Sequence, residues 1–253
     1  NSLVISNGSI MTIASTSSTN NTCYGGTAGT ITAVISGGAA PRTITATNTV
    51  TNLSYSIAVP TTGTTYRISN LPAGNYTVTA NDISSCTPSV TGVMVTQPNQ
   101  LAVTASKTDA TCNGLSDGTL TATITGGTAP YTYQWLDSTA ANVSGATSAS
   151  MSSIAAGTYS VSVSDACSAT ATSSTVTIAQ PAAITIASAV KTAYNGADLT
   201  CATATDGEIT VTASGGTGTL VYSKDSGANY QASNVFSNLF SSSFSRSFAY
   251  IFF

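Results

Sequence analysis

The chain has 253 residues, of which only 6% are charged; its formal net charge is −3 and it contains no histidine. Six Lys plus Arg residues cannot neutralise a phosphate backbone, so a nucleic-acid partner is not expected. A hydrophobic fraction of 42% at low net charge is unlike a disordered chain and predicts a folded one. Because there is no run of 18 apolar residues and no charged-then-apolar leader, neither a membrane span nor a signal peptide is expected.

Strand-forming residues dominate the sequence. Ser and Thr make up a third of the chain, and Thr, Val, Ile and Tyr recur in alternating runs. Branched and aromatic side chains pack well on a pleated surface, so these runs predict an all-β fold. A surface rich in hydroxyl groups and poor in charge is typical of extracellular fibrous proteins, which makes an extracellular location the expectation.

A repeat of 89 residues organises the chain. The segments GTITAVISGG, GTLTATITGG and GEITVTASGG begin at Gly29, Gly118 and Gly207, and a cysteine precedes each at the same interval. LPAGNYTVTAND at 71–82 matches IAAGTYSVSVSD at 154–165 with an offset of 83, so the first copy holds six extra residues between positions 38 and 71. The expected copies are residues 8–98, 99–181 and 182–253, and residues 1–7 would complete a preceding unit.

Alternation within each copy predicts which side chains face a core. The expected inward positions are Ile31, Ala33 and Ile35, then Leu120, Ala122 and Ile124, then Ile209, Val211 and Ala213. In the second copy, Tyr131, Tyr133 and Trp135 follow on one face of the next strand and are expected in the core. A sugar-binding aromatic strip is the alternative, but Trp135 has no counterpart in the other copies.

The motif Leu/Ile-x-Ala-Gly-x-Tyr is typical of the tyrosine corner of Ig-like sandwiches, in which the Tyr hydroxyl bonds to the backbone upstream. Gly74 with Tyr76 and Gly157 with Tyr159 hold these structural positions. Together with the many short strands, the motif predicts tandem Ig-like antiparallel β-sandwiches of about seven strands each. The closing Gln-Pro pairs leave very short links, so we expect an elongated rod.

The ordered set of Cys112, Asp117-Gly118, Gly126-Gly127, Pro130-Tyr131, Trp135, the tyrosine-corner segment, Cys167 and Gln180-Pro181 resembles the SprB-type repeat. The likeness extends over nearly the whole chain. It implies the stalk of a large cell-surface adhesin of gliding bacteria, exported by type IX secretion. The first copy departs from the pattern, with Ala28 in place of Asp117 and Arg42 in place of Tyr131.

With two cysteines in each complete copy, the expected disulfides are Cys23–Cys86 and Cys112–Cys167, and Cys201 is left without a partner. The wide spacing of the cysteines does not match a zinc site, whose ligands come in close pairs.

No cofactor is expected. Asp117 and Asp206 precede glycines and read as ordinary Asp-Gly turns, although Asp82 and Asp165 at strand ends leave bound calcium open as an alternative. Without histidine, and with Glu208 as the single glutamate, the chain has no recognisable catalytic constellation, so an enzyme is not expected.

Two functions remain open: a structural stalk of a surface adhesin or filament, and a carbohydrate-binding module of a secreted protein. Expected partners are neighbouring repeats of the same chain, with surface polysaccharide or other filament subunits as further candidates. Residues 240–253 are an atypical end, because LFSSSFSRSFAY replaces the tyrosine-corner segment and puts Arg246 at an inward position.

Overall fold

The computed structural model describes residues 10–60, 63–85, 87–193, 196–240 and 250–252, and the regular elements of this part of the chain are β-strands. In these residues no helix is long and apolar enough to cross a membrane. The chain divides into two compact units. Unit 1 comprises Asn1–Thr104, Thr123–Tyr133 and Ser162–Ser173, and unit 2 comprises Ala105–Ala122, Gln134–Val161 and Ser174–Phe253. The boundaries of the three expected copies stay a prediction, and residues 1–7 lie outside the described part.

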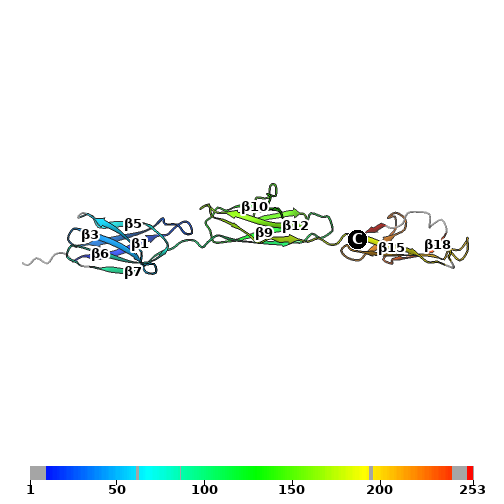
Figure 1. Ribbon diagram of the computed structural model, residues 1–253, viewed down its shortest axis with the longest axis horizontal. Coiled ribbons are helices and arrows are strands. Elements are labelled where there is room, and N and C mark those ends of the chain that lie inside the picture. The colour runs from blue at the N-terminus through cyan, green and yellow to red at the C-terminus, as the bar shows by residue number, and fades with distance from the viewer. Residues whose placement is uncertain (1–9, 61–62, 86, 194–195, 241–249, 253) are drawn as a thin grey trace, which may run out of the picture. The chain divides into compact units, whose positions relative to one another are not determined.

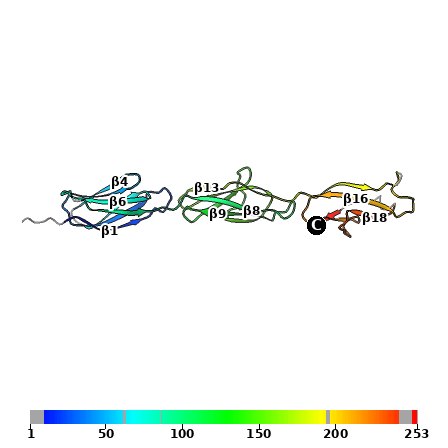
Figure 2. The same ribbon diagram turned by 90° about the horizontal axis from the view of Figure 1, so that it is seen from below.

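The first sandwich lies entirely in unit 1 and has two antiparallel sheets. One sheet has the strand order β1-β2-β5 and the other β4-β3-β6-β7. Figure 1 shows these strands in blue and cyan, and Figure 2 shows β4 and β6 on one side of the sandwich with β1 on the other. The strands are β1 (Thr12–Thr19), β2 (Gly29–Ser36), β3 (Arg42–Asn48), β4 (Ser54–Val59), β5 (Thr65–Leu71), β6 (Gly74–Asn81) and β7 (Ser89–Val95).

Alternation along the strands builds the core of this sandwich. Ile31, Ala33 and Ile35 of β2 are buried, as predicted. They pack against buried residues of the opposite sheet, among them Ile44 and Val78. The side chains between them, Thr32 and Val34, point the other way, since successive residues of a strand face opposite sides of the sheet.

The six extra residues of the first copy fall in the region where β4 forms. β3 and β4 make an antiparallel hairpin in which Arg42 pairs with Val59 and Thr47 with Ser54. In the second copy the corresponding region has an isolated bridge between Leu136 and Asn142. The insertion therefore lengthens one edge of a sheet and leaves the rest of the pattern in register.

The second set of strands shares the topology of the first. Its sheets have the orders β11-β9-β8 and β10-β12-β13, and β14 also pairs with β12. Trp135 is fully buried and its indole Nε1 donates to the Ser148 carbonyl at 3.0 Å, so the predicted core position is confirmed. The strands are β8 (Ala102–Thr108), β9 (Gly118–Thr125), β10 (Thr132–Leu136), β11 (Ser150–Ile154), β12 (Gly157–Ser164), β13 (Thr170–Thr172) and β14 (Val176–Ile178).

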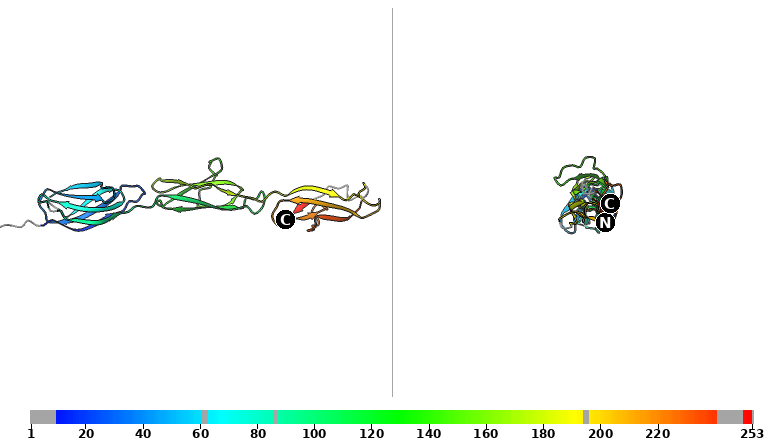
Figure 3. Two further views of the ribbon diagram at one scale, coloured as in Figure 1. Left: turned by 60° about the horizontal axis from the view of Figure 1, so that its bottom comes forward. Right: turned by 90° about the vertical axis from the view of Figure 1, so that its right-hand side faces the viewer.

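The third set of strands lies in unit 2 and forms the sheets β15-β16-β18 and β17-β19. Figure 3 shows β15 and β16 side by side in yellow and orange. Ile209 and Val211 are buried, whereas Ala213, like Ile124 in the second set, is half-buried. The strands are β15 (Thr185–Lys191), β16 (Gly207–Ser214), β17 (Val221–Ser223), β18 (Val235–Leu239) and β19 (Tyr250–Phe252). The side chain of Arg246 lies outside the described residues.

The two tyrosine motifs make equivalent hydrogen bonds. The Tyr76 hydroxyl donates to the Pro72 carbonyl at 2.8 Å, and the Tyr159 hydroxyl donates to the Ala155 carbonyl at 3.2 Å. Burial raises the pKa of Tyr76, so this hydroxyl keeps its proton and remains a donor. Gly74 is required beside it, because a Cβ at that position would overlap the Asn48 amide.

The departure of the first copy at Arg42 has a structural explanation. The Tyr131 hydroxyl donates to the Gly126 carbonyl at 2.8 Å. Arg42 is buried, and its Nη1 donates to the carbonyl of Gly37 at 3.1 Å, the glycine that corresponds to Gly126. A guanidinium group thus satisfies the same carbonyl as a phenol hydroxyl.

Candidate functional site: a disulfide between two turns

The turn that carries Cys23 follows β1 and is anchored by a buried asparagine. Asn21 Oδ1 accepts from the Gly29 amide at 2.8 Å, and Asn21 Nδ2 donates to the Leu71 carbonyl at 3.1 Å. The backbone amide of Asn21 donates to the Thr96 carbonyl at 2.8 Å. One side chain therefore ties the turn to the start of β2 and the end of β5.

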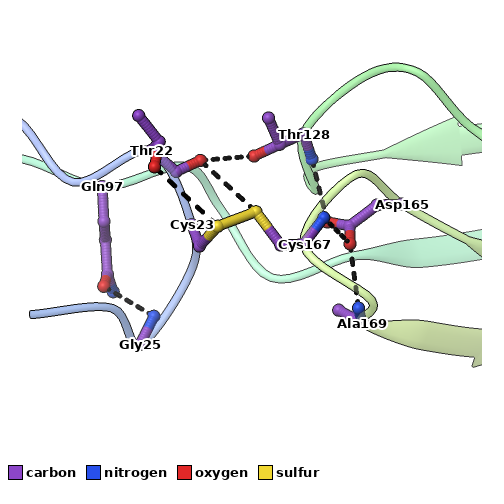
Figure 4. Close-up of a disulfide and its surroundings, with 8 residues drawn as sticks. All are labelled: Thr22, Cys23, Gly25, Gln97, Thr128, Asp165, Cys167 and Ala169. Atoms are coloured by element: carbon purple, nitrogen blue, oxygen red, sulfur yellow. Dashed lines mark hydrogen bonds between the residues drawn. A yellow bond between two sulfur atoms is a disulfide. The ribbon is translucent and has the colours of Figure 1, made fainter. Parts of the chain in front are cut away.

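A second anchor comes from the residues that leave the sandwich after β7. Gln97 Oε1 accepts from the Gly25 amide at 2.8 Å (Figure 4). Gly25 has φ of 70°, a left-handed conformation that glycine adopts without strain. The Cys23 turn is thus held at the end of the first sandwich where Gln97 and Pro98 leave it.

The turn that carries Cys167 is organised by Asp165. Asp165 Oδ1 accepts from the amides of Cys167 and Ala169, each at 2.9 Å, and Oδ2 accepts from the Thr128 amide at 3.0 Å. Desolvation opposes the charge of this carboxylate, but the backbone donors outweigh it and lower the pKa of Asp165. The Asp165 oxygens are therefore occupied by hydrogen bonds that hold the turn. Asp82 does the same in the first copy, where it accepts from the Ala39 and Ser84 amides, each at 3.0 Å.

A disulfide joins these two turns, with 5.8 Å between the Cα atoms of Cys23 and Cys167 (Figure 4). Beside it, the Thr128 hydroxyl donates to the Thr22 carbonyl at 2.6 Å. The Cys167 Sγ lies 3.7 Å from the same carbonyl oxygen, a van der Waals contact because a disulfide sulfur carries no hydrogen. All of these residues belong to unit 1.

The expected pairings Cys23–Cys86 and Cys112–Cys167 are therefore corrected: Cys23 pairs with Cys167, and Cys112 has a free thiol. The reason is strand direction. β6 starts near the Cys23 end, where Gly74 pairs with Val95, and its eight residues carry the chain about 26 Å away from that end, as far as Asn81. Cys86 itself lies outside the described residues.

β12 separates the other expected pair in the same way. Its first residue, Gly157, pairs with Ile178, close to Gln180, whose Oε1 accepts from the Gly114 amide of the Cys112 turn at 2.8 Å. Its last residue, Ser164, pairs with Thr170, in the hairpin whose turn carries Cys167. A disulfide between Cys112 and Cys167 would have to span the length of the strand.

The contacts around Thr22 recur 89 residues further along the chain, within unit 2. The Thr217 hydroxyl donates to the Thr111 carbonyl at 3.3 Å, as Thr128 does to Thr22. The half-buried Cys112 lies beside it, with 3.7 Å between Sγ and the Thr217 Oγ1. The threonine contact therefore forms with or without a disulfide.

Aspartates anchor the two later turns. Asp117 Oδ1 accepts from the Thr111 amide at 3.0 Å, and Asp206 Oδ1 accepts from the Thr200 amide at 3.3 Å. Each also accepts from the hydroxyl of the same threonine, which is the largest cause of the lowered pKa of both carboxyls. In the residues that the structure describes, no group of three or more His, Cys, Asp or Glu side chains is placed to hold a metal ion.

Three further side chains, those of Trp135, Asp137 and Cys201, are placed as follows. Trp135 offers no exposed ring for a sugar, because its indole is fully buried. Asp137 Oδ1 accepts from the amides of Thr139 and Ala141, at 2.8 and 3.1 Å, so it closes an exposed turn. Cys201 is exposed, and hydrogen bonding from the Thr203 hydroxyl is the main cause of its lowered pKa.

Sequence reasoning missed Asn21 and the pair of Thr22 and Thr128. Asn21 was hidden because the corresponding residues, Ala110 and Leu199, are apolar and buried. The threonines carried a signal, since a Thr precedes each of Cys23, Cys112 and Cys201.

Comparison with solved structures gives distant similarities that carry no argument about this chain. The four N-terminal Ig domains of Dscam1 isoform 9.44 match with 15% identity over 68% of this chain and 46% of that chain, at a TM-score of 0.30. A C-terminal fragment of intimin, solved with the intimin-binding domain of its translocated receptor, matches with 17% identity over 69% and 66%, at 0.31. The chain spans less than half of the Dscam chains that it matches.

No curated protein matches the chain. The family model described as the SprB repeat matches residues 15–51, 104–140 and 193–229. These three segments begin 89 residues apart and include the Thr-Cys turn and the strand that follows it in each copy. The chain therefore contains three segments that are similar to the SprB repeat.

Proposed function

We propose that these repeats are structural spacers in the stalk of a secreted bacterial surface adhesin or filament. The observation that carries the proposal is that the features which recur between copies are structural. Inward apolar residues, tyrosine hydrogen bonds, the glutamine anchors and the threonine contacts at the cysteine turns all serve folding and connection. A stalk needs these features in each copy, whereas a binding module needs a ligand site in each copy.

An extracellular location fits the chemistry of the chain. Disulfides form and persist in oxidising compartments, so the Cys23–Cys167 disulfide supports this location. The SprB-repeat matches connect the chain to a surface protein, and export by the type IX route of a gliding bacterium is part of the proposal.

The surface also suits a spacer. The polar faces of the strands carry mainly threonine and serine, which pair with each other across strands, as Thr45 does with Ser56 at 2.8 Å and Thr47 with Ser54 at 2.9 Å. Few charges mean little electrostatic steering of other molecules toward the stalk. Neighbouring repeats of the same chain are the proposed partners, and the function is non-enzymatic.

Two measurements on the whole chain test the proposal together. Small-angle scattering is expected to give an extended particle, and a glycan array is expected to give no binding. A compact particle, or micromolar affinity for one class of sugar, would replace the spacer with the carbohydrate-binding module.

A further inference from the structure

The Cys23–Cys167 disulfide closes a covalent loop of the chain that contains most of the strands of two sandwiches. The two cysteines are 144 residues apart in sequence. Strands β2 through β12 lie between them, and only β1 precedes Cys23 in the described residues. A pull applied to the two ends of the chain therefore has a covalent path that omits residues 24–166.

We propose that this disulfide carries tension between consecutive repeats: it passes the tension from the Cys23 turn directly to the Cys167 turn and shields residues 24–166 from unfolding under force. The mechanical role rests on the proposed stalk function, since a stalk is pulled along its length. The covalent path itself depends only on which cysteines are joined.

The length at stake is large. A fully extended chain spans about 3.3 to 3.6 Å per residue, so a separation of 144 residues corresponds to about 500 Å. The disulfide holds the same two positions at 5.8 Å. A stalk whose repeats are linked in this way keeps its reach when individual sandwiches open.

The segment that does carry the tension has little slack. β1 runs from Thr12 to Thr19 and pairs with β2 along this length. A strand already rises about 3.3 Å per residue, close to the limit of about 3.6 Å. Beyond β1, Asn21 and Gln97 fix the Cys23 turn, so tension reaches the sulfur through a path that is nearly taut.

The turn that receives the tension is built to hold it. Three backbone amides, those of Thr128, Cys167 and Ala169, donate to the Asp165 carboxylate. The Asp165 carbonyl also accepts from the Ser168 amide at 3.0 Å, and its amide donates to the Ala169 carbonyl at 3.0 Å. These bonds tie the turn to the start of β13 and to the loop at Thr128.

The threonine contact recurs where there is no disulfide, so the hydroxyl-to-carbonyl hydrogen bond does not depend on the disulfide. Thr217 and Thr111 repeat the contact of Thr128 and Thr22, and Cys112 stands where Cys23 stands. A single hydroxyl-to-carbonyl hydrogen bond aligns two turns but yields under load. The disulfide converts this alignment into a covalent connection.

Force spectroscopy on the whole chain, held by handles at its two ends, tests the inference. The oxidised protein is expected to release about 500 Å less length in total than the same protein after reduction. The Cys23→Ser variant should behave like the reduced protein, and the matched control Cys112→Ser should behave like the oxidised one. The reduced wild type gives the comparison even if Cys23→Ser folds poorly.

Equal total lengths before and after reduction would overturn the inference, as would a non-reducing peptide map that links Cys23 to Cys86. Neither result would touch the spacer function. A sugar ligand found on the glycan array would remove the stalk function and leave the length difference standing, so the two proposals fail separately.

Discussion

The turns at Cys23 and Cys112 reach the same geometry by different means. In both turns a glycine amide donates to Oε1 of the glutamine that closes the copy, at 2.8 Å in each case. The first turn is held by the buried side-chain amide of Asn21, and the second by the exposed carboxylate of Asp117. Only the first is joined to another turn by a disulfide.

This difference teaches that the position of the turn does not depend on the disulfide. Thr111 receives the Thr217 hydroxyl in the absence of a bridge, as Thr22 receives the Thr128 hydroxyl in its presence. The local anchors set the geometry, and the disulfide adds covalent strength to one of the two places. Four changes would break or sharpen this comparison.

Loss of the disulfide is expected to have the largest effect. On the chain-entropy model, a bridge between residues 144 apart stabilises the folded state by about 5 kcal/mol, so Cys23→Ser should lower the total free energy of unfolding by that amount. Urea denaturation of the whole oxidised chain measures it. Cys112→Ser should change it by less than about 0.5 kcal/mol, and equal losses in the two variants would contradict the pairing.

Removal of the buried amide should come next. Asn21→Ala leaves the Gly29 amide and the Leu71 carbonyl without their partner in a buried place, which is expected to cost about 3 kcal/mol. The exposed neighbour Asn20, which accepts from the Thr96 amide, is the control, and Asn20→Ala should cost about 1 kcal/mol. Similar losses for the two variants would show that burial does not govern this anchor.

The shared glutamine anchor should have equal value in both turns. Gln97→Ala and Gln180→Ala each remove one acceptor for a glycine amide, so each is expected to cost about 1 kcal/mol. The two variants are compared in the same denaturation experiment. A clear difference between them would mean that the disulfide strengthens the anchor beside it.

Low pH should weaken the Asp117 turn and leave the Asn21 turn unchanged, and this is the smallest of the four expected effects. The folded-state pKa of Asp117 lies below its ordinary value, so its stabilisation is present above the unfolded-state pKa and is lost as pH falls through the folded-state pKa. Amide exchange should therefore show that Thr111 loses protection as the pH falls below the ordinary aspartate pKa of about 3.9 and through the lowered pKa of Asp117. Gly29, whose acceptor Asn21 does not titrate, is the internal control.

Much of the sandwich could be predicted from periodicity. Ile31, Leu120 and Ile209 recur at the repeat interval on strands of alternating pattern, and all three are buried. A ligand site repeated in each copy would require a counterpart of Trp135 in the other copies. No counterpart exists, so Trp135 could be assigned to the core. These features follow from local sequence, which determines which face of a strand is apolar.

The disulfide pairing could not be predicted from the count of two cysteines per copy. It depends on where strands begin: β2 and β6 both start at the end where Gly29 pairs with Leu71. Cys23 precedes β2, and β6 runs away from this end as far as Asn81, so the pairing follows strand direction, which a count of cysteines does not contain. The role of Asn21 could not be predicted for another reason. Comparison of the copies identifies residues that recur, and Asn21 occurs in one copy only.

The interval of 89 residues between the threonine contacts has a consequence for how such a gene can change. Thr22 and Thr111 offer the same carbonyl, and Thr128 and Thr217 offer the same hydroxyl, one interval apart. Duplication or loss of one whole interval would leave each acceptor facing a matching donor. Unequal recombination by whole intervals can therefore lengthen or shorten the protein without creating a new kind of interface.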